Sequence, residues 1–355
     1  MGSMITLGIG KMELDWGKNN VFNDHSCLFQ KEDIKIVPYY YSDNEIEYKE
    51  GFSKNIMSVR RRLDLLGYSL YEIEELFNEE SAMFKQLCSS STPITFHDFY
   101  NTVINVDIQN INMASDEYDS DYDLGEYVRK CVIHEIKDLS NFPYYDAYDI
   151  GYFLENLDPY ITLEKILIVT EGSSDTDIIK KSINRLYSDI ADFFDFIDME
   201  QNYPFTGTGN LKNFVKGLSK INILNKILVI LDNDTAGISV YNDIKTIDLP
   251  NNLKVITLPN YKDFDNFKCK GPQGDSLENI NGKAVSIECF LDHSSIDDEI
   301  YVRWTSFNDK LIQYQGNIEP KNLLIKSFHQ YYKQEYDFTK LKYLVDYILE
   351  SCTFK

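Results

Sequence analysis

An alternation of short apolar runs and helical segments between residues 165 and 258 constrains the fold more than any other feature. Buried strands are predicted at Lys165–Thr170, Phe193–Ile197, Lys226–Leu231 and Leu253–Leu258. Helices are predicted between them, at residues 176–187, 211–218 and 239–247. Continuous apolar strands that alternate with helices indicate a parallel sheet with helices on both faces. The predicted class is therefore α/β, in which function lies beyond the carboxyl ends of the strands.

Acidic side chains directly follow two of these strands. Glu171 comes after the first strand, and Asp232 and Asp234 come after the third. The carboxyl ends of parallel strands can be neighbours, so we expect the three side chains to converge. Asp232 and Asp234 are two positions apart on extended chain and therefore point the same way. Crowded carboxylates repel one another, and a divalent cation such as Mg²⁺ or Mn²⁺ resolves that cost.

The predicted metal ligands are Glu171, Asp232 and Asp234, with Asp175 as a further candidate. Such an ion could polarise a phosphodiester and activate an attacking water. Gly172 and Gly237 are interpreted as positions where a Cβ would obstruct the backbone beside the metal. The alternative is that these acidic residues only form turns or cap helices, a role that suits Asp175 equally well.

The composition indicates in which compartment the protein acts and which partners it can bind. A formal net charge of −22 argues against a protein that coats nucleic acid passively. It does not exclude an enzyme that places metal between its carboxylates and phosphate. The six cysteines are scattered without a Cys-x-x-Cys pair, so no zinc module is predicted. Because no basic N-terminal segment precedes an apolar stretch and no run approaches the roughly 20 residues of a membrane span, we expect a cytoplasmic protein without membrane contact.

Four lysines are the candidates for contact with nucleic-acid phosphates, namely Lys180, Lys212, Lys216 and Lys283. Lys212 and Lys216 are preferred because they follow the Gly207–Gly209 loop, which should border the site. Each lysine alone is more typical of solvated surface. Arg60, Arg61 and Arg62 are likewise expected on the solvated face of a helix.

The length of 355 residues suggests two domains with room for an appendage. Residues 1–160 are predicted to form an α+β domain, with strands in the first forty residues and helices near 56–66, 70–76 and 125–139. Residues 161–265 form the α/β domain. Residues 266–355 are predicted to be a mostly helical extension that packs on it, with helices at 323–328 and 341–349.

The two acidic motifs resemble those of a known domain. A strand ending in Glu-Gly-x-x-Asp at 171–175, then one ending in Asp-x-Asp-x-x-Gly at 232–237, resembles the Toprim domain of topoisomerases, bacterial primases and OLD-family nucleases. The resemblance covers roughly residues 163–260 and implies a Toprim-type parallel sheet. It also implies that Glu171, Asp232 and Asp234 bind Mg²⁺ in catalysis, with Glu171 as a general acid or base.

The flanking segments are similar to those of bacterial HEPN/Toprim-associated proteins. This similarity rests on Arg62-Leu63-x-x-Leu66-Gly67, Gly271-Pro272-Gln273-Gly274, Asn281-Gly282-Lys283-Ala284 and Arg303-Trp304-Thr305. It implies a nuclease acting on DNA or on RNA such as tRNA, in the role of an antiphage defence effector. Since the chain lacks Gly-x-x-x-x-Gly-Lys-Ser/Thr, we expect any ATPase or sensor to be a separate partner. A homo-oligomer is also expected.

Two alternatives remain open at this point. The α/β domain could be a non-catalytic scaffold that binds a partner protein. An Arg-x-x-x-x-His motif, Arg129 to His134, matches that of metal-independent HEPN ribonucleases. The motif is short, and a surface pair of side chains is the simpler interpretation.

Overall fold

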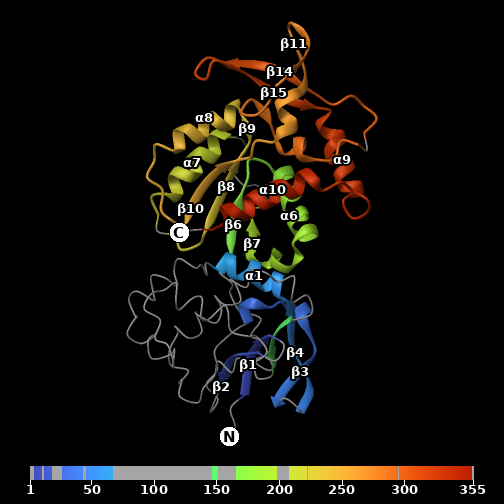
Figure 1. Ribbon diagram of the computed structural model, residues 1–355. Helices are drawn as coiled ribbons and strands as arrows, with labels where there is room; N and C mark the ends of the chain where they lie inside the picture. Colours follow the sequence, from blue (N-terminus) through green and yellow to red (C-terminus); the bar gives the residue numbers. More distant parts are fainter. Residues whose placement is uncertain are drawn as a thin grey trace, which may run out of the picture. The chain divides into compact units, whose positions relative to one another are not determined.

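The computed structural model describes residues 4–9, 12–17, 26–42, 45–66, 146–150, 165–197, 208–221, 223–294 and 296–353. The chain divides into two compact units, Met1–Leu163 and Glu164–Lys355, and each is considered by itself (Figure 1). The helices predicted at 70–76 and 125–139, and the motif from Arg129 to His134, lie outside the described residues. Among the helices that are described, none is both long and apolar enough to span a bilayer.

The first unit contains an antiparallel sheet of five strands in the order β2-β1-β5-β4-β3. The strands are β1 (Met4–Ile9), β2 (Met12–Gly17), β3 (Ile34–Ser42), β4 (Glu45–Asn55) and β5 (Asp146–Ile150). Two short 3-10 helices, Ser26–Leu28 and Lys31–Asp33, precede β3, and α1 (Ile56–Leu66) follows β4 directly. The strands predicted in the first forty residues and the helix predicted near 56–66 are present, whereas β4 and β5 were not predicted.

Arg62 corrects one expectation about this unit. Its side chain is fully buried rather than solvated. The guanidinium donates to the backbone carbonyl of Cys27 at 2.9 Å and to that of Phe29 at 3.2 Å. A buried cation must satisfy its donors inside the protein, and these carbonyls fix the segment before β3 against α1.

The second unit is built on a parallel sheet of four strands in the order β10-β8-β6-β7. The strands are β6 (Ile166–Val169), β7 (Phe194–Phe196), β8 (Ile227–Leu231) and β10 (Leu253–Thr257), and the helices between them are α6 (Ser173–Leu186), α7 (Thr208–Leu218) and α8 (Thr235–Ile244). The predicted α/β sheet is confirmed. Helix α8 begins four residues earlier than predicted, because the Asp234 carboxylate accepts the backbone N–H of Gly237 at 2.7 Å and so caps it.

Apolar side chains fill both faces of this sheet. On one face, Val229 and Leu231 belong to a buried cluster with Val215 of α7 and Ile244 of α8. Residues on the opposite face, such as Leu228, are equally buried. That face meets α10 (Thr339–Ser351), since Lys254, paired with Leu228 on the neighbouring strand, donates to the Ser351 carbonyl at 3.4 Å. Helix α10 also packs on α6.

The region after residue 266 is not mostly helical, so that prediction was wrong. It contains a second sheet in the order β12-β11-β14-β15. The new elements are β11 (Phe267–Gly271), β12 (Gly274–Glu278), β13 (Ala284–Val285), β14 (Tyr301–Asn308), β15 (Gln313–Glu319) and α9 (Lys321–Tyr331), with 3-10 helices at Lys262–Asn266 and Ile287–Phe290. The helices predicted at 323–328 and 341–349 lie within α9 and α10. The strands were missed because both faces of β12 and half of the residues of β14 are exposed, which leaves no continuous apolar run.

A short pairing connects the two sheets of this unit. Strand β9 (Asn233–Asp234) continues from the end of β8 and pairs antiparallel with β13, with Ala284 opposite Asp234. The C-terminal region is thereby hydrogen-bonded to the acidic end of β8.

Candidate functional site

The structure brings the acidic ends of β6 and β8 together. Glu171 lies in the turn after β6, and its Oε1 accepts the backbone N–H of Asp232 at 3.2 Å. The two residues are 61 positions apart in the chain, but β6 and β8 are adjacent and parallel. The expected convergence of Glu171 with Asp232 therefore occurs at the carboxyl edge of the sheet.

Asp175 joins the same cluster from the first turn of α6. Its Oδ2 accepts the backbone N–H of Gly172 at 3.1 Å, so it stabilises the start of the helix as a cap does. Burial, followed by the negative charge of Glu288, raises the pKa of Asp175 to about 7. Asp175 thus stabilises the start of α6 and is also close enough to Glu288 and Glu171 to interact with their charges.

Asp234 is held by hydrogen bonds to both of its carboxylate oxygens. Oδ1 accepts the Gly237 N–H at 2.7 Å, and Oδ2 accepts a short hydrogen bond from Nε2 of Gln315 on β15. Oε1 of the same glutamine accepts the backbone N–H of Ala236 at 3.0 Å. Gln315 therefore ties β15 to the start of α8 and fixes the orientation of Asp234.

The two glycines of the acidic motifs differ in whether the structure has room for a Cβ at their positions. A Cβ on Gly237 would lie 2.1 Å from the backbone oxygen of Asp232, so only glycine fits there. A Cβ on Gly172 would meet its nearest neighbour, Asp175, at an ordinary contact distance of 3.4 Å. The expected close approach is confirmed for Gly237, and Gly172 does not need to be glycine for that reason.

A fifth carboxylate, missed in the sequence, comes from the 3-10 helix after β13. Glu288 is fully buried, its Oε2 accepts the Ser286 hydroxyl at 2.7 Å, and its Oε1 lies 2.9 Å from Nζ of Lys321. A signal existed, because an acidic residue inside the apolar run Ile287–Leu291 must be paired when the run is buried. The sequence offered no means of identifying Lys321 as its partner.

These five carboxylates share one electrostatic environment. Burial raises the pKa of Asp232 well above its ordinary value, and the charges of Asp175, Glu171, Asp234 and Glu288 raise it further. Burial also raises the pKa of Asp234, although its hydrogen bonds oppose the change. Burial alone would lower the pKa of Lys321, but the charges of Glu288 and Asp175 outweigh it and the pKa is raised. Among the described residues, Lys321 is the cation whose charge acts on these acids, and the cluster favours further positive charge.

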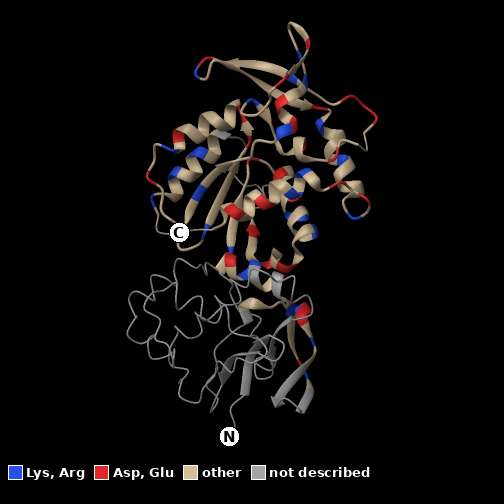
Figure 2. Cartoon of the chain, in the orientation of Figure 1, with Lys and Arg blue, Asp and Glu red and all other residues tan. Residues whose placement is uncertain are grey.

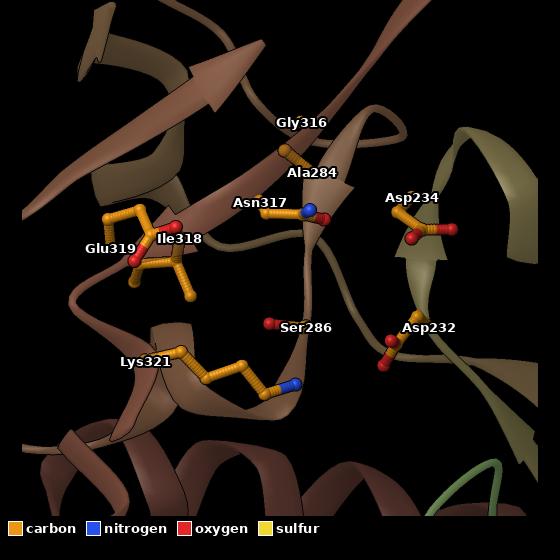
Figure 3. A pocket seen from close by; sticks show the side chains of 9 residues that line it. All are labelled: Asp232, Asp234, Ala284, Ser286, Gly316, Asn317, Ile318, Glu319 and Lys321. Atoms are coloured by element: carbon orange, nitrogen blue, oxygen red, sulfur yellow. The ribbon is translucent and has the colours of Figure 1, made fainter. Parts of the chain in front are cut away.

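A cavity of about 230 Å³ opens beside this cluster. Its lining consists of Asp232, Asp234, Ala284, Ser286, Gly316, Asn317, Ile318, Glu319 and Lys321. Figure 3 shows Asp232 and Asp234 on one side, with Lys321 extending toward Asp232 from the opposite side. The cavity thus exposes three carboxylates, those of Asp232, Asp234 and Glu319, and one cation to the same small volume.

The donor chemistry of this site fits a hard divalent cation. The carboxylates and the hydroxyl of Ser286 offer oxygen ligands at the acidic end of β8, and such ions prefer oxygen ligands. Within the described ranges, however, no three His, Cys, Asp or Glu side chains are placed so that they could hold a metal ion as they stand. In this arrangement Oε1 of Glu171 accepts the Asp232 N–H. Metal binding would therefore require the carboxylates to move from these positions.

The four predicted phosphate-binding lysines are all described, and none of them lines the cavity. Lys212 of α7 pairs with Asp243 of α8 at 2.5 Å. Lys180 and Lys216 are exposed on α6 and α7, while the carbonyl of Lys283 accepts the Gly316 N–H at 3.2 Å. Basic and acidic residues both occur along the second unit in Figure 2, and α6 carries both kinds, whereas α7 contains basic residues and no acidic one. Their contact with phosphate stays a prediction.

Comparison with known families shows which family the chain belongs to. A family model described as HEPN/Toprim N-terminal domain 1 matches residues 1–186, more than half of the 355 residues. The chain belongs to this family. In this HEPN/Toprim protein the matched segment ends in α6, so it contains Glu171 and Asp175 but not Asp232 or Asp234. The family is associated with nucleases. No curated protein and no solved structure matches the chain.

Proposed function

We propose that this HEPN/Toprim protein is a Mg²⁺- or Mn²⁺-dependent nuclease that hydrolyses phosphodiester bonds of DNA or RNA at the carboxylate cavity. The observation that carries the proposal is the contact between Glu171 and Asp232 across adjacent parallel strands, beside a cavity lined by Asp234 and Lys321. The strand order and the two acidic motifs agree with a Toprim-type domain. We also propose the wider role of a cytoplasmic antiphage effector that works with a separate ATPase or sensor.

Glu171, Asp232 and Asp234 would hold the metal, with Asp175 and Glu288 as neighbouring acids. A bound divalent ion supplies Lewis-acid activation of the phosphodiester and a more acidic water. Lys321 has a raised pKa and is therefore protonated near neutral pH. Its side chain is 47% exposed and faces the cavity, where it can contact a phosphate oxygen. Glu171 would move a proton as general acid or base.

Cleavage by the purified full-length chain tests this function. Plasmid DNA and tRNA are incubated with Mg²⁺, with Mn²⁺ or with EDTA, and cleavage is expected only with metal. The Asp232→Asn/Asp234→Asn double variant should lose cleavage. Asp243→Asn is the matched control, because Asp243 is a partly exposed carboxylate that pairs with Lys212 and Lys310 and does not line the cavity. A double variant as active as the wild type would refute the assignment.

A second candidate function is a non-catalytic scaffold that binds a partner protein. The observation that favours it is that the described carboxylates are not arranged to hold metal as they stand. Calorimetric titration separates the two functions. Binding of Mn²⁺ that Asp232→Asn/Asp234→Asn abolishes supports the nuclease, whereas the absence of Mn²⁺ and Mg²⁺ binding supports the scaffold.

A further inference from the structure

Three aromatic residues cluster on the β14–β15 hairpin, which lies at the top of the second unit in Figure 1. Phe307 of β14 is paired with Tyr314 of β15, and their ring centroids lie 5.1 Å apart in an edge-to-face arrangement. Trp304 lies 6.4 Å from Tyr314. Phe307 and Tyr314 are 49% and 47% exposed. We call Trp304, Phe307 and Tyr314 the hairpin aromatic cluster.

The strand register explains why these rings share one face. Trp304 pairs with Gly316 and Phe307 with Tyr314, and a shift in register lies between Trp304 and Ser306. Gly316 and Tyr314 are two positions apart on β15, so both positions lie on the same face of the sheet. The shift therefore brings Phe307 onto the face that holds Trp304.

Trp304 is fixed in place by its surroundings. Its Nε1 donates to Oε1 of Glu278 at 3.2 Å. A Cβ on Gly316 would lie 2.8 Å from the indole, so glycine at this position leaves room for the ring. Fixed rings lose little conformational entropy when they bind a ligand, and Trp304 is thereby a preorganised member of the cluster.

Strand β15 connects this cluster to the carboxylate cavity. Gly316 and Asn317 line the cavity, Gln315 donates to Asp234, and Tyr314 follows at the next position. The Tyr314 carbonyl also accepts the hydroxyl of Thr235 at 2.8 Å, directly after Asp234. At about 3.3 Å per residue, only about 7 Å of strand separates Tyr314 from Gly316.

The hairpin also avoids the negative charge of the rest of the chain. The hairpin, residues 301–319, contains two basic residues, Arg303 and Lys310, and two acidic residues, Asp309 and Glu319, so it is formally neutral in a protein of net charge −22. A polyanion meets the least repulsion at such a surface. Aromatic side chains bind unpaired bases by stacking with little regard to sequence, whereas the bases of a duplex are already stacked on one another.

We propose that the hairpin aromatic cluster stacks with unpaired bases of the nucleic-acid strand whose backbone enters the carboxylate cavity. The substrate class is then single-stranded DNA or RNA, or single-stranded stretches of a folded RNA. This inference rests on the proposed nuclease function for its account of the cavity, but the base-binding surface is separately testable.

The test measures binding of the full-length protein to fluorescent oligo(dT) and oligo(rU) of about 20 nucleotides by anisotropy. EDTA is present, so that neither metal nor cleavage is needed. We expect Phe307→Ala/Tyr314→Ala to bind about 10- to 100-fold more weakly than wild type. Phe307→Leu/Tyr314→Leu, which keeps apolar surface but removes the rings, should show a similar loss. Tyr48→Ala removes an exposed strand tyrosine of the first unit and should bind as wild type does. A duplex of the same sequence should bind more weakly than either oligonucleotide.

The outcomes separate this inference from the proposed function. Oligonucleotide binding that needs the two rings, in a protein that never cleaves, supports the inference and contradicts the nuclease. Cleavage that needs Asp232 and Asp234, with full binding by the alanine double variant, contradicts the inference alone. If the leucine double variant binds the oligonucleotides as tightly as wild type, then any apolar surface suffices and the stacking proposal is overturned. A sedimentation change in the double variant without loss of oligonucleotide affinity would assign the cluster to protein contact and overturn it too.

Discussion

The two walls of the cavity differ in how their charges are balanced. The acidic wall, formed at the parallel sheet, comprises the cavity residues Asp232 and Asp234 with the neighbouring Glu171 and Asp175. Burial, and then the charges of the surrounding acids, raise the pKa values of Asp175 and Asp232. The C-terminal wall comprises Glu319 and Lys321 with the neighbouring buried acid Glu288, whose cation is built in, since Lys321 lies 2.9 Å away. The buried carboxylates of the acidic wall repel one another, whereas the buried charge of Glu288 in the C-terminal wall is balanced by Lys321. Loss of charge should therefore have opposite effects on stability in the two walls, although both contribute to the proposed reaction.

The largest effect is expected for Asp232→Asn in the acidic wall. Cleavage should fall roughly 10³-fold, because the substitution removes a central metal ligand. The unfolding temperature measured in EDTA should rise, because the variant relieves repulsion among the buried acids. Calorimetry and a plasmid-nicking assay measure the two quantities on the same sample. A lower unfolding temperature with unchanged cleavage would contradict the comparison of the walls.

Lys321→Met in the C-terminal wall should lower both quantities. Cleavage is expected to fall about 10²-fold through loss of the cation, and the free energy of unfolding by about 2 kcal/mol, because Glu288 stays buried without its partner. The matched control is Lys321→Met/Glu288→Gln. That double variant should recover most of the stability but not the cleavage. If Lys321→Met alone is as stable as wild type in urea titration, Glu288 is not compensated as the structure indicates.

The acidic wall could be predicted from the sequence because its elements leave strong patterns. The buried strands β6 and β8 are continuous apolar runs, and in a parallel sheet their carboxyl ends must lie at one edge. Glu171, Asp232 and Asp234 follow those runs directly, so local sequence and topology together placed them.

The C-terminal wall could not be predicted in the same way. Lys321 follows Pro320 at the start of α9, and nothing near it in sequence marks a buried acid 33 positions earlier. Gln315 lies on a strand whose exposed residues conceal its periodicity, and its partner Asp234 is 81 positions away. The contacts of this wall depend on how a second sheet packs against the first, which hydrophobic periodicity does not encode.

Gln315 tests how far the second wall controls the first. Gln315→Leu removes the amide that orients Asp234 and should weaken Mn²⁺ binding about 10-fold, as loss of a ligand's supporting hydrogen bond commonly does. Gln313→Leu is the matched control on the same strand, since Gln313 donates to the Gly282 carbonyl at 2.9 Å and not to a carboxylate. Calorimetric titration measures both affinities. Equal Mn²⁺ affinity in the two variants would show that Gln315 does not position Asp234 for metal.

The smallest effect is a pH dependence of stability that belongs to the acidic wall. The pKa of Asp175 is raised from 3.8 to about 7, so between these values the folded protein binds a proton that the unfolded chain releases. Protonated Asp175 therefore stabilises the folded protein at low pH, and this stabilisation is lost as pH rises toward about 7. In EDTA, the free energy of unfolding should therefore fall between about pH 5.5 and 7.5, by an amount of the order of 1 kcal/mol from this group.

Asp175→Asn isolates that contribution. The amide oxygen can still accept the Gly172 N–H, so the start of α6 is kept. His293, whose pKa burial lowers to about 4, changes stability in the opposite sense, because protonation below pH 6.5 favours the unfolded chain. It is present in both proteins, so its contribution cancels, and the difference between wild type and Asp175→Asn reports Asp175 together with its effect on the pKa of Asp232. Urea titrations should give a flatter pH profile for the variant, and Mn²⁺ should reduce the slope of the wild type, because the ion replaces the proton as the positive charge of the acidic wall. Parallel profiles without metal would mean that Asp175 is ionised in the folded protein, and the acidic wall would then tolerate its charges without a cation.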